Sequence, residues 1–322
     1  MDAPRSATSA SNDQLLELFQ AIRRELKLRE EAPTGEWVER SAEEARAGTR
    51  PAWFYPPEVD GGGLAVYTRR EGKAWGHVHS TAGPVAQERA LRLATVLFEG
   101  LPSDVRSLAL GFSGFDVVEE RRVADALAVH PGSRVVERYQ MERRLRPDPP
   151  VEVPAPPAGV RLIPVRDATL EAVSDLDARS FRDTVDDLVV GGSLQQYSDM
   201  MRGLLDSQMG RFLDEASTLL LQPDPLRLVG GVLCAEASPR EAVILDLMVE
   251  PERRGHGSGR FLLRWALRAV HALGYATATL WVTEANRPAL RLYETEGFRR
   301  TASTVIFHWG RPDVEPHPQT SR

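Results

Sequence analysis

Three glycines fall within five residues in the segment 254–260, which reads Arg-Gly-His-Gly-Ser-Gly-Arg. Glycine lets the backbone bend sharply, so that several N–H groups turn toward one point. An apolar, β-branched run from Ala242 to Val249 precedes the segment and predicts a buried strand. Apolar residues at helical spacing follow it from Phe261 to Leu273, and Gly274 ends that helix. Because a helix start adds unpaired donors and the positive end of its dipole, the segment predicts a phosphate or pyrophosphate site.

The order of the glycines excludes the two commonest phosphate-binding loops. The chain contains no Gly-x-x-x-x-Gly-Lys-Ser/Thr segment, which a Walker loop requires. The order Gly255-His-Gly257-Ser-Gly259 also differs from the Gly-x-Gly-x-x-Gly pattern of dinucleotide-binding folds.

A second segment with a defined spacing follows the loop. It runs from Asn286 to Phe298 and reads Asn-Arg-Pro-Ala-Leu-Arg-Leu-Tyr-Glu-Thr-Glu-Gly-Phe. This segment resembles the Asn-x-x-Ala-x-x-Leu-Tyr-x-x-x-Gly-Phe signature of the GNAT acetyltransferase superfamily, and the loop resembles that family's Arg/Gln-x-x-Gly-x-Gly/Ala acyl-CoA loop. The resemblance covers about residues 160–310 and implies an α/β fold, with a mixed, mostly antiparallel sheet flanked by helices.

The resemblance also implies acetyl-CoA as the co-substrate. In the family, backbone N–H groups of the loop hold the pyrophosphate, and main-chain N–H groups at a splayed strand end face the acetyl carbonyl. The residues implied in cofactor binding are Leu247, Met248, Val249, Arg254, Gly255, His256, Gly257, Ser258, Gly259, Arg260 and Asn286. Arg254 and Arg260 would add charge. His256 stands at a variable position of the motif, where its backbone matters and not its imidazole, and Asn286 would also cap a helix.

Two residues are the candidates for proton transfer. The family position of Tyr293 implies a phenol that protonates the departing thiolate, although a core tyrosine would explain the same packed helix face. Asp246 lies nearest to the reactive stretch and is the favoured general base, with Glu241 and Glu284 as alternatives. Ribosomal-protein Nα-acetyltransferases carry a catalytic Glu five residues before the Asn. Trp281 stands there in this chain, which counts against that activity and leaves the base open.

Carboxylates are dense in the segment 175–187, where the family forms the far wall of its acceptor site. Asp183, Asp186 and Asp187 would attract a cationic amine, such as an aminoglycoside, a polyamine or an N-terminal peptide. A solvated helix face explains them equally well. Tandem members of the superfamily include mycothiol synthases, but no acceptor-specific motif links this chain to them.

Composition limits the classes of partner. A net charge of −6 argues against a nucleic-acid or anionic-membrane partner. No apolar run approaches the roughly 20 residues that span a bilayer, and the N-terminus has no apolar signal core, so a cytoplasmic location is expected. Cys234 is the single cysteine and reads as inert packing. His77 and His79 share a strand face without a third ligand in view, so no metal is expected. The oligomeric state stays open between monomer and homodimer.

The chain is long enough for two domains. We expect residues 1–11 to be disordered within a first domain of residues 1–146, and a proline-rich linker at 147–159. A catalytic domain at 160–310 and a polar tail at 311–322 would follow. Residues 123–135 also align with 288–300 at an offset of 165, each copy with a glycine that ends a helix before a strand. The first domain would then be a degenerate copy of the second that binds no CoA, because Ser80–Val85 carries a single glycine and a proline.

The sequence therefore predicts an acetyl-CoA-dependent N-acetyltransferase that acts on a primary amine by direct attack in a ternary complex. A small cationic amine is the favoured acceptor. The alternatives are a non-catalytic acyl-CoA-binding or regulatory protein, and an acetyltransferase that acts on a protein N-terminus or lysine.

Overall fold

A computed structural model gives the structure of the chain. It describes residues 3–28, 35–57, 62–70, 72–145, 151–182, 184–187, 194–207 and 210–311. The chain divides into two compact units, residues 1–138 with 303–322 and residues 139–302. Within the described residues, no helix has the length and apolar character needed to cross a membrane.

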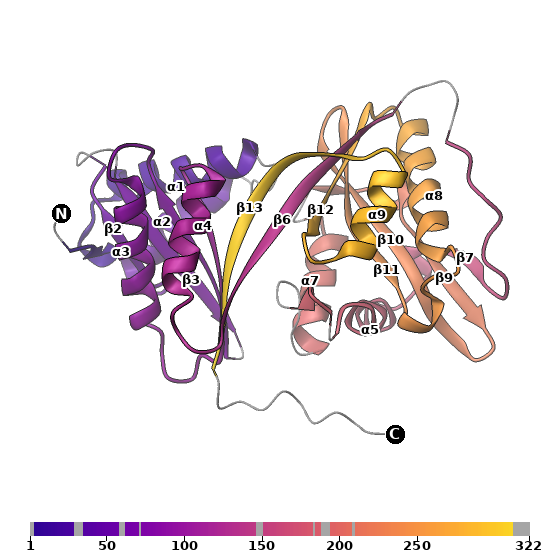
Figure 1. Ribbon diagram of the computed structural model, residues 1–322, viewed down its shortest axis with the longest axis horizontal. Coiled ribbons are helices and arrows are strands. Elements are labelled where there is room, and N and C mark those ends of the chain that lie inside the picture. The colour runs from indigo at the N-terminus through magenta and orange to yellow at the C-terminus, as the bar shows by residue number, and fades with distance from the viewer. Residues whose placement is uncertain are drawn as a thin grey trace. The chain divides into compact units, whose positions relative to one another are not determined.

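The first unit is a sheet with helices on both faces (Figure 1). Its strand order is β1-β2-β3-β4-β5-β13-β6, antiparallel from β1 to β4 and between β5 and β13, with β4 and β5 parallel. The strands are β1 (Arg5–Ser6), β2 (Ala52–Tyr55), β3 (Gly63–Arg70), β4 (Lys73–Ser80), β5 (Ser107–Ser113) and β6 (Ser133–Arg144), together with the end of β13 (Arg299–Gly310). The helices are α1 (Asn12–Leu28) and α2 (Gly35–Ala47) on one face, and α3 (Ala86–Glu99) and α4 (Val117–Leu127) on the other.

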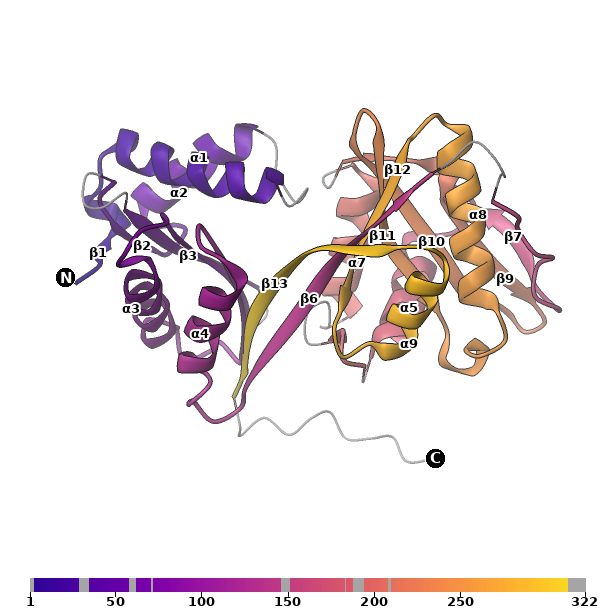
Figure 2. The same cartoon turned by 45° about the horizontal axis from the view of Figure 1, so that its top comes forward.

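The second unit has the same plan (Figure 2). Its strand order is β6-β12-β11-β10-β9-β7, with β8 also on β10, and β11 and β12 are parallel. The strands are β7 (Arg161–Pro164), β8 (Arg211–Phe212), β9 (Thr218–Pro223), β10 (Leu226–Ser238), β11 (Glu241–Val249) and β12 (Thr277–Thr283). The helices are α5 (Leu170–Phe181) and α7 (Leu194–Leu205) on one face, and α8 (Ser258–Ala272) and α9 (Arg287–Thr295) on the other. The expected mixed, mostly antiparallel sheets flanked by helices are confirmed.

The sequence repeat has a structural counterpart. The order β4-α3-β5-α4 of the first unit recurs as β11-α8-β12-α9 in the second. Gly132 and Gly297, which the offset of 165 pairs, follow α4 and α9 with φ of +83° and +85°. A residue with a Cβ rarely adopts this left-handed backbone, so both positions favour glycine.

The division of the chain differs from the predicted domain boundaries. Residues 139–144 of β6 already belong to the second unit, whereas residues 303–310 of β13 belong to the first. Val305 and Phe307 of β13 are fully buried in the core of the first unit, against α3 and β5. The proline-rich segment lies within the second unit, where Val151 and Val153 pack against the core. Residues 146–150 and 312–322 lie outside the described residues.

One local expectation was also wrong. Residues 3–11 are ordered, because β1 pairs with β2 and Ala7 and Ala10 are buried against it. Helix α2 is an element that the sequence pattern does not single out. Its buried stripe is Val38, Ser41, Ala42 and Ala45, and small side chains give a weak hydrophobic signal.

Candidate active site

The two strands that lead into the glycine loop separate at their ends. β11 and β12 pair from Glu241 with Thr277 as far as Ile244 with Leu280, and no further. Both strands continue, β11 to Val249 and β12 to Thr283. Beyond Ile244 the edge of β11 turned away from β10 therefore pairs with no strand of the described residues, and its alternate N–H groups have no strand acceptor. We call this unpaired stretch between β11 and β12 the opening. The splay expected at Leu247, Met248 and Val249 is thus present.

The first unit lacks this opening. Its parallel pair β4 and β5 remains in register from Lys73 with Ser107 to His79 with Ser113, which is the last residue of β5. Ser113 also contacts both histidine rings of β4, at 2.7 Å from His77 Nε2 and 3.0 Å from His79 Nδ1. These contacts close the carboxyl end of the sheet where the second unit is open. In the described part of the chain, no group of His, Cys, Asp or Glu side chains is arranged to hold a metal ion.

The loop that follows β11 is exposed and shaped by glycine. Gly255 and Gly257 have φ of +78° and +86°, and no heavy atom lies within 4 Å of the position a Cβ would take on either. Gly257 is the N-cap of α8, and no side chain caps this helix start. The first N–H groups of α8, at Ser258, Gly259 and Arg260, therefore have no capping side chain, and the positive end of the helix dipole lies there. This geometry suits an anion.

The two arginines that flank the loop have different roles. Arg254 donates from Nε to the Val249 carbonyl at 3.1 Å and from Nη2 to the Ser180 carbonyl at 2.5 Å. Since both acceptors are neutral, its full charge stays beside the loop. Arg260 instead pairs at 3.1 Å with the buried Glu296, which Arg264 also contacts at 2.8 Å.

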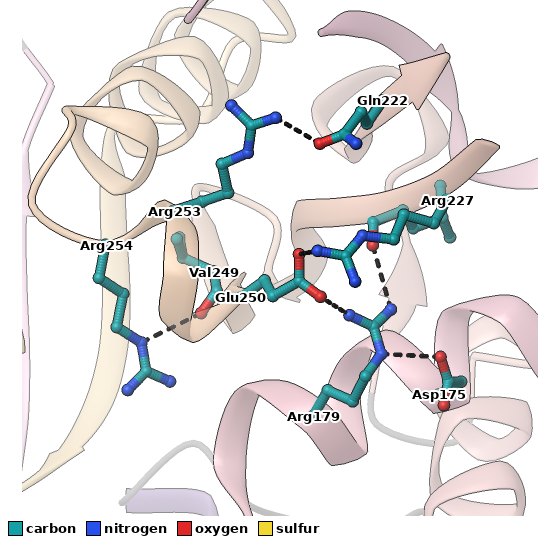
Figure 3. Close-up of polar contacts among 9 residues, drawn as sticks. Asp175, Arg179, Gln222, Arg227, Val249, Glu250, Arg253 and Arg254 are labelled. Carbon is teal, nitrogen blue, oxygen red and sulfur yellow. Dashed lines mark hydrogen bonds and ion pairs between the residues drawn. The ribbon is translucent and has the colours of Figure 1, made fainter. Parts of the chain in front are cut away.

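A buried carboxylate supports the loop from below. Glu250 follows β11 directly and is 2% exposed. It forms ion pairs with Arg179 of α5 and, at 2.7 Å, with Arg227 of β10 (Figure 3). Arg179 also donates to Asp175 at 2.8 Å and to the Leu228 carbonyl at 3.1 Å. This network joins three elements at the base of the loop, and nothing in the sequence pattern singles it out.

Helix α9 packs against the start of α8. A Cβ on Gly259 would lie 3.5 Å from Leu292 Cδ2 and 3.7 Å from Val249 Cγ2, so α9, the loop and the end of β11 meet there. Tyr293, the next residue on α9, is 8% exposed within the core cluster, with its ring 5.9 Å from that of Phe298. Its buried position agrees with a core tyrosine, and its place beside the loop agrees with the acid role, which stays a prediction.

Asn286 links α9 to the acidic segment. Its side-chain oxygen accepts from the Ala289 N–H at 3.2 Å, as expected for an N-cap. Its Nδ2 donates to Asp186 Oδ2 at 2.7 Å. Asp187 of the same segment accepts from the Tyr197 hydroxyl of α7 at 3.2 Å. Asp183 lies outside the described residues.

The three candidate bases lie in different places. Glu241 stands at the opposite end of β11, and Glu284 pairs with Arg287 at 3.0 Å beyond the end of β12. Asp246 is 9% exposed and belongs to the part of β11 beyond the last pair with β12. Burial raises the pKa of its carboxyl to about 7, and the nearby Asp186 charge adds to this. Asp246 is therefore poised to exchange a proton near neutral pH.

Sequence reasoning missed one buried carboxyl at this site. Asp177 of α5 is fully buried, and burial, together with the Asp246 carboxyl beside it, raises its pKa well above the usual range for an aspartate. The sequence presents Asp177 only as one acid of the segment 175–187, because it does not show which side of α5 meets Asp246.

Several buried polar atoms near Asp246 have no hydrogen-bond partner among the described residues. Among the described residues, neither side-chain oxygen of Asp177 accepts a hydrogen bond from an N–H or hydroxyl group, and the Ser180 and Thr283 hydroxyls have no partner. These residues are 0%, 2% and 2% exposed. Native proteins leave few buried polar groups unsatisfied. By contrast, Cys234 is fully buried in β10, and burial raises the pKa of its thiol, so it is inert packing.

An unpaired strand end followed by an uncapped, glycine-formed helix start is the defining feature of this α/β unit. Residues 183–298, which lie within the second unit, match the acetyltransferase (GNAT) family. Together with the fold and the two motifs, this match makes the second unit a member of the GNAT superfamily.

Curated relatives and solved structures are similar to different extents. The mycothiol acetyltransferase of Thermomonospora curvata is 32% identical over 188 residues, which cover 57% of this chain and 59% of the relative. That of Thermobispora bispora is 33% identical over 167 residues, or 49% and 52% of the two chains. The match thus spans little more than half the length of these relatives. No acceptor-specific motif in the sequence points to them.

Two solved structures share the fold over almost the whole chain. A GCN5-related N-acetyltransferase from Sphaerobacter thermophilus has a TM-score of 0.64 at 16% identity and covers 97% of both chains. A tandem GNAT protein from the clavulanic acid biosynthesis pathway has a TM-score of 0.56 at 17% identity and covers 96% of this chain and 97% of its own. At these identities the likeness concerns the fold alone.

Proposed function

We propose that the second unit transfers an acetyl group from acetyl-CoA to a primary amine. The observation that carries this proposal is the separation of β11 from β12 directly before an uncapped helix start. An anion on the loop and an extended chain in the opening would then be held by one continuous stretch of backbone. Acetyl-CoA has this shape, with a pyrophosphate at one end of a pantetheine arm.

The residues of the loop and strand end would bind and polarise the co-substrate. N–H groups of residues 255–260 would hold the pyrophosphate, with the uncompensated charge of Arg254 beside them. Main-chain N–H groups among Leu247, Met248 and Val249 would donate to the acetyl carbonyl oxygen, where negative charge develops. Acetyl-CoA supplies an activated thioester.

Two side chains would move protons. Asp246 would take a proton from the acceptor ammonium, since its carboxyl ionises near neutral pH. Tyr293 would protonate the departing thiolate through its phenol O–H.

The acceptor would be a small cationic amine. Asp186, Asp187 and Asp246 lie near one another, and Asn286 holds Asp186 in place. Buried carboxylates attract an ammonium group more strongly than exposed ones, because screening is weaker. The curated relatives carry the name mycothiol acetyltransferase, which agrees with a small-molecule acceptor.

The test is release of CoA thiol from acetyl-CoA over a panel of small amines, peptides and lysine-containing proteins. The wild-type chain should turn over at least one small amine, and Tyr293→Phe should reduce kcat by roughly 100-fold or more while acetyl-CoA still binds. Saturable binding without turnover of any acceptor would favour a non-catalytic acyl-CoA-binding protein. Turnover of protein acceptors alone would overturn the small-amine proposal.

The first unit would bind no acyl-CoA, because β4 and β5 stay paired to the end of β5. Calorimetric titration of the whole chain with acetyl-CoA tests this. We expect one site per chain; two sites of similar affinity would contradict the proposal. The whole chain is needed, because a piece that ends at residue 146 lacks the part of β13 that belongs to the first unit.

A further inference from the structure

A β-bulge sets the direction of the Asp246 side chain. In the pairing of β10 with β11, Leu233 lies opposite Asp246 and Cys234 lies opposite Ile244, so Leu245 is an extra residue. Before the bulge, Ile244 packs in the core beneath α8. After it, Met248 packs in the core beneath α5 and α7, as Leu245 also does. Without the extra residue, strict alternation would turn Asp246 to the same face as Ile244. The bulge instead turns Asp246 toward α5.

Asp177 meets Asp246 from α5. It lies next to Leu176 and one turn after Val173, which pack in the same core beneath α5 and α7. The two carboxyl groups are within hydrogen-bonding reach of each other. Two ionised carboxylates repel and cannot share a hydrogen bond, so a proton must lie between them.

The surroundings decide which carboxyl keeps this proton. The Leu247 backbone N–H donates to Asp246 and lowers its pKa, which favours the ionised form there. Asp177 accepts from no N–H or hydroxyl group of the described residues. Nearby stand Asp186, held by Asn286, and Tyr197, which donates to Asp187 and lies near Arg182. The proton therefore belongs on Asp177 and the negative charge on Asp246.

We propose that Asp177 acts as a neutral carboxylic acid whose O–H donates to the Asp246 carboxylate and so positions the base for the acceptor amine. This inference rests on the proposed function. The acceptor ammonium, R–NH3+, gives one proton to Asp246 and becomes R–NH2, and the charge of the carboxyl pair falls from −1 to zero. The amine nitrogen then bonds to the acetyl carbon as the carbon–sulfur bond breaks. The sulfur gains a proton through Tyr293, which regains one from the new amide nitrogen, and Asp246 returns its proton to solvent.

Two substitutions at Asp177 separate its role as a hydrogen-bond donor to Asp246 from its role in filling the core. Asp177→Asn keeps a donor at nearly the same place, whereas Asp177→Leu has a similar volume and no donor. Glu171→Gln changes an exposed carboxylate on the same helix and is the control. The assay is kcat/KM for one amine acceptor against pH, with acetyl-CoA saturating. Using the same acceptor throughout cancels the ionisation of the amine itself.

We expect Asp177→Asn and Glu171→Gln to keep the wild-type pH profile. Asp177→Leu should move the acid limb upward by about one pH unit or more, because the ionised base loses its donor. This lowers kcat/KM by about fivefold at pH 7 and by about tenfold well below pH 7. Equal profiles for the Asp177→Asn and Asp177→Leu variants would show that Asp177 has only a structural role and would overturn the proposal.

A second measurement does not depend on turnover. Infrared spectra of the folded wild-type chain at pH 8 should contain the band of a protonated carboxylic acid. This band should be absent from the Asp177→Asn variant and kept in the Glu171→Gln variant. No such band in the wild type would overturn the inference even if the enzyme is active. A wild-type chain that shows the band but acetylates no amine would contradict the proposed function and still support the shared proton between Asp177 and Asp246.

Discussion

Replacing Asp246 by asparagine should make the protein more stable at alkaline pH while it removes activity. The pKa of Asp246 is raised from 3.8 to about 7 by burial. A carboxyl whose pKa is raised in the folded state binds its proton more tightly there than in the unfolded chain. Its stabilising contribution is complete below the unfolded pKa, and it is lost as pH rises through the folded pKa. The Asp246→Asn variant has no such loss, because an amide does not ionise.

The magnitude follows from the two pKa values. Each pKa unit corresponds to about 1.4 kcal/mol, so ionising Asp246 in the folded state costs on the order of 4 kcal/mol at pH 8 and about 1.7 kcal/mol at pH 5. Any difference in fit between the amide and the acid contributes equally at both pH values. The difference in unfolding free energy between Asp246→Asn and the wild type should therefore rise by about 2.5 kcal/mol from pH 5 to pH 8.

The assay is urea unfolding of both proteins at pH 5 and pH 8, followed by tryptophan fluorescence. Glu171→Gln, which changes an exposed carboxylate, should show the wild-type pH dependence. Relief of the repulsion on Asp177 acts in the same direction as the main effect. A difference that stays within about 0.5 kcal/mol between the two pH values would refute the reasoning, because Asp246 would then titrate as an ordinary carboxyl.

Three further experiments test the loop and its supports. Gly257→Ala and Gly274→Ala both force alanine into a left-handed backbone and should each cost about 1–2 kcal/mol of stability. Only Gly257→Ala should raise KM for acetyl-CoA. Equal KM values for the two variants would show that the loop does not bind the co-substrate. Glu250→Gln should lower Tm and raise KM for acetyl-CoA, since it leaves Arg227 without its carboxylate and Arg179 with Asp175 alone, at a cost of about 1–3 kcal/mol because both arginines are partly exposed; an unchanged melting curve would contradict this. Asn286→Ser should keep the helix cap, whereas Asn286→Ala should lose it and lower the unfolding free energy by about 1 kcal/mol. Both variants should raise KM for the amine, because both lose the hydrogen bond to Asp186. Equal stability of the two variants would argue against the cap.

The local pattern of the sequence predicted most of what positions the site. Helix α8, the glycine loop and the run that becomes β11 follow from hydrophobic periodicity and from the conformations open only to glycine. The signature from Asn286 to Phe298 likewise placed α9. These features are local, so a single stretch of residues contains the information.

The features that the sequence did not predict depend on contacts between distant elements. The run from Ala242 to Val249 is apolar apart from Asp246, so nothing in it marks Leu245 as the extra residue of a bulge. The facing of Asp177 and Asp246 needs both the bulge and the rotation of α5 about its axis. The end of β13 fits either sheet by its pattern, and only the core that buries Val305 and Phe307 shows which one it joins.

Because the end of β13 belongs to the first unit, the two units cannot fold in the order in which they are synthesised. The first unit cannot complete its sheet when its own residues leave the ribosome, because the strand between β5 and β6 is encoded at the far end of the message. Until residues 303–310 emerge, β5 and β6 expose the edges that this strand will cover, and exposed edges invite pairing with other chains. Translation of the whole second unit must therefore finish before the nascent N-terminal half is protected, and a stalled ribosome would hold a chain prone to aggregate.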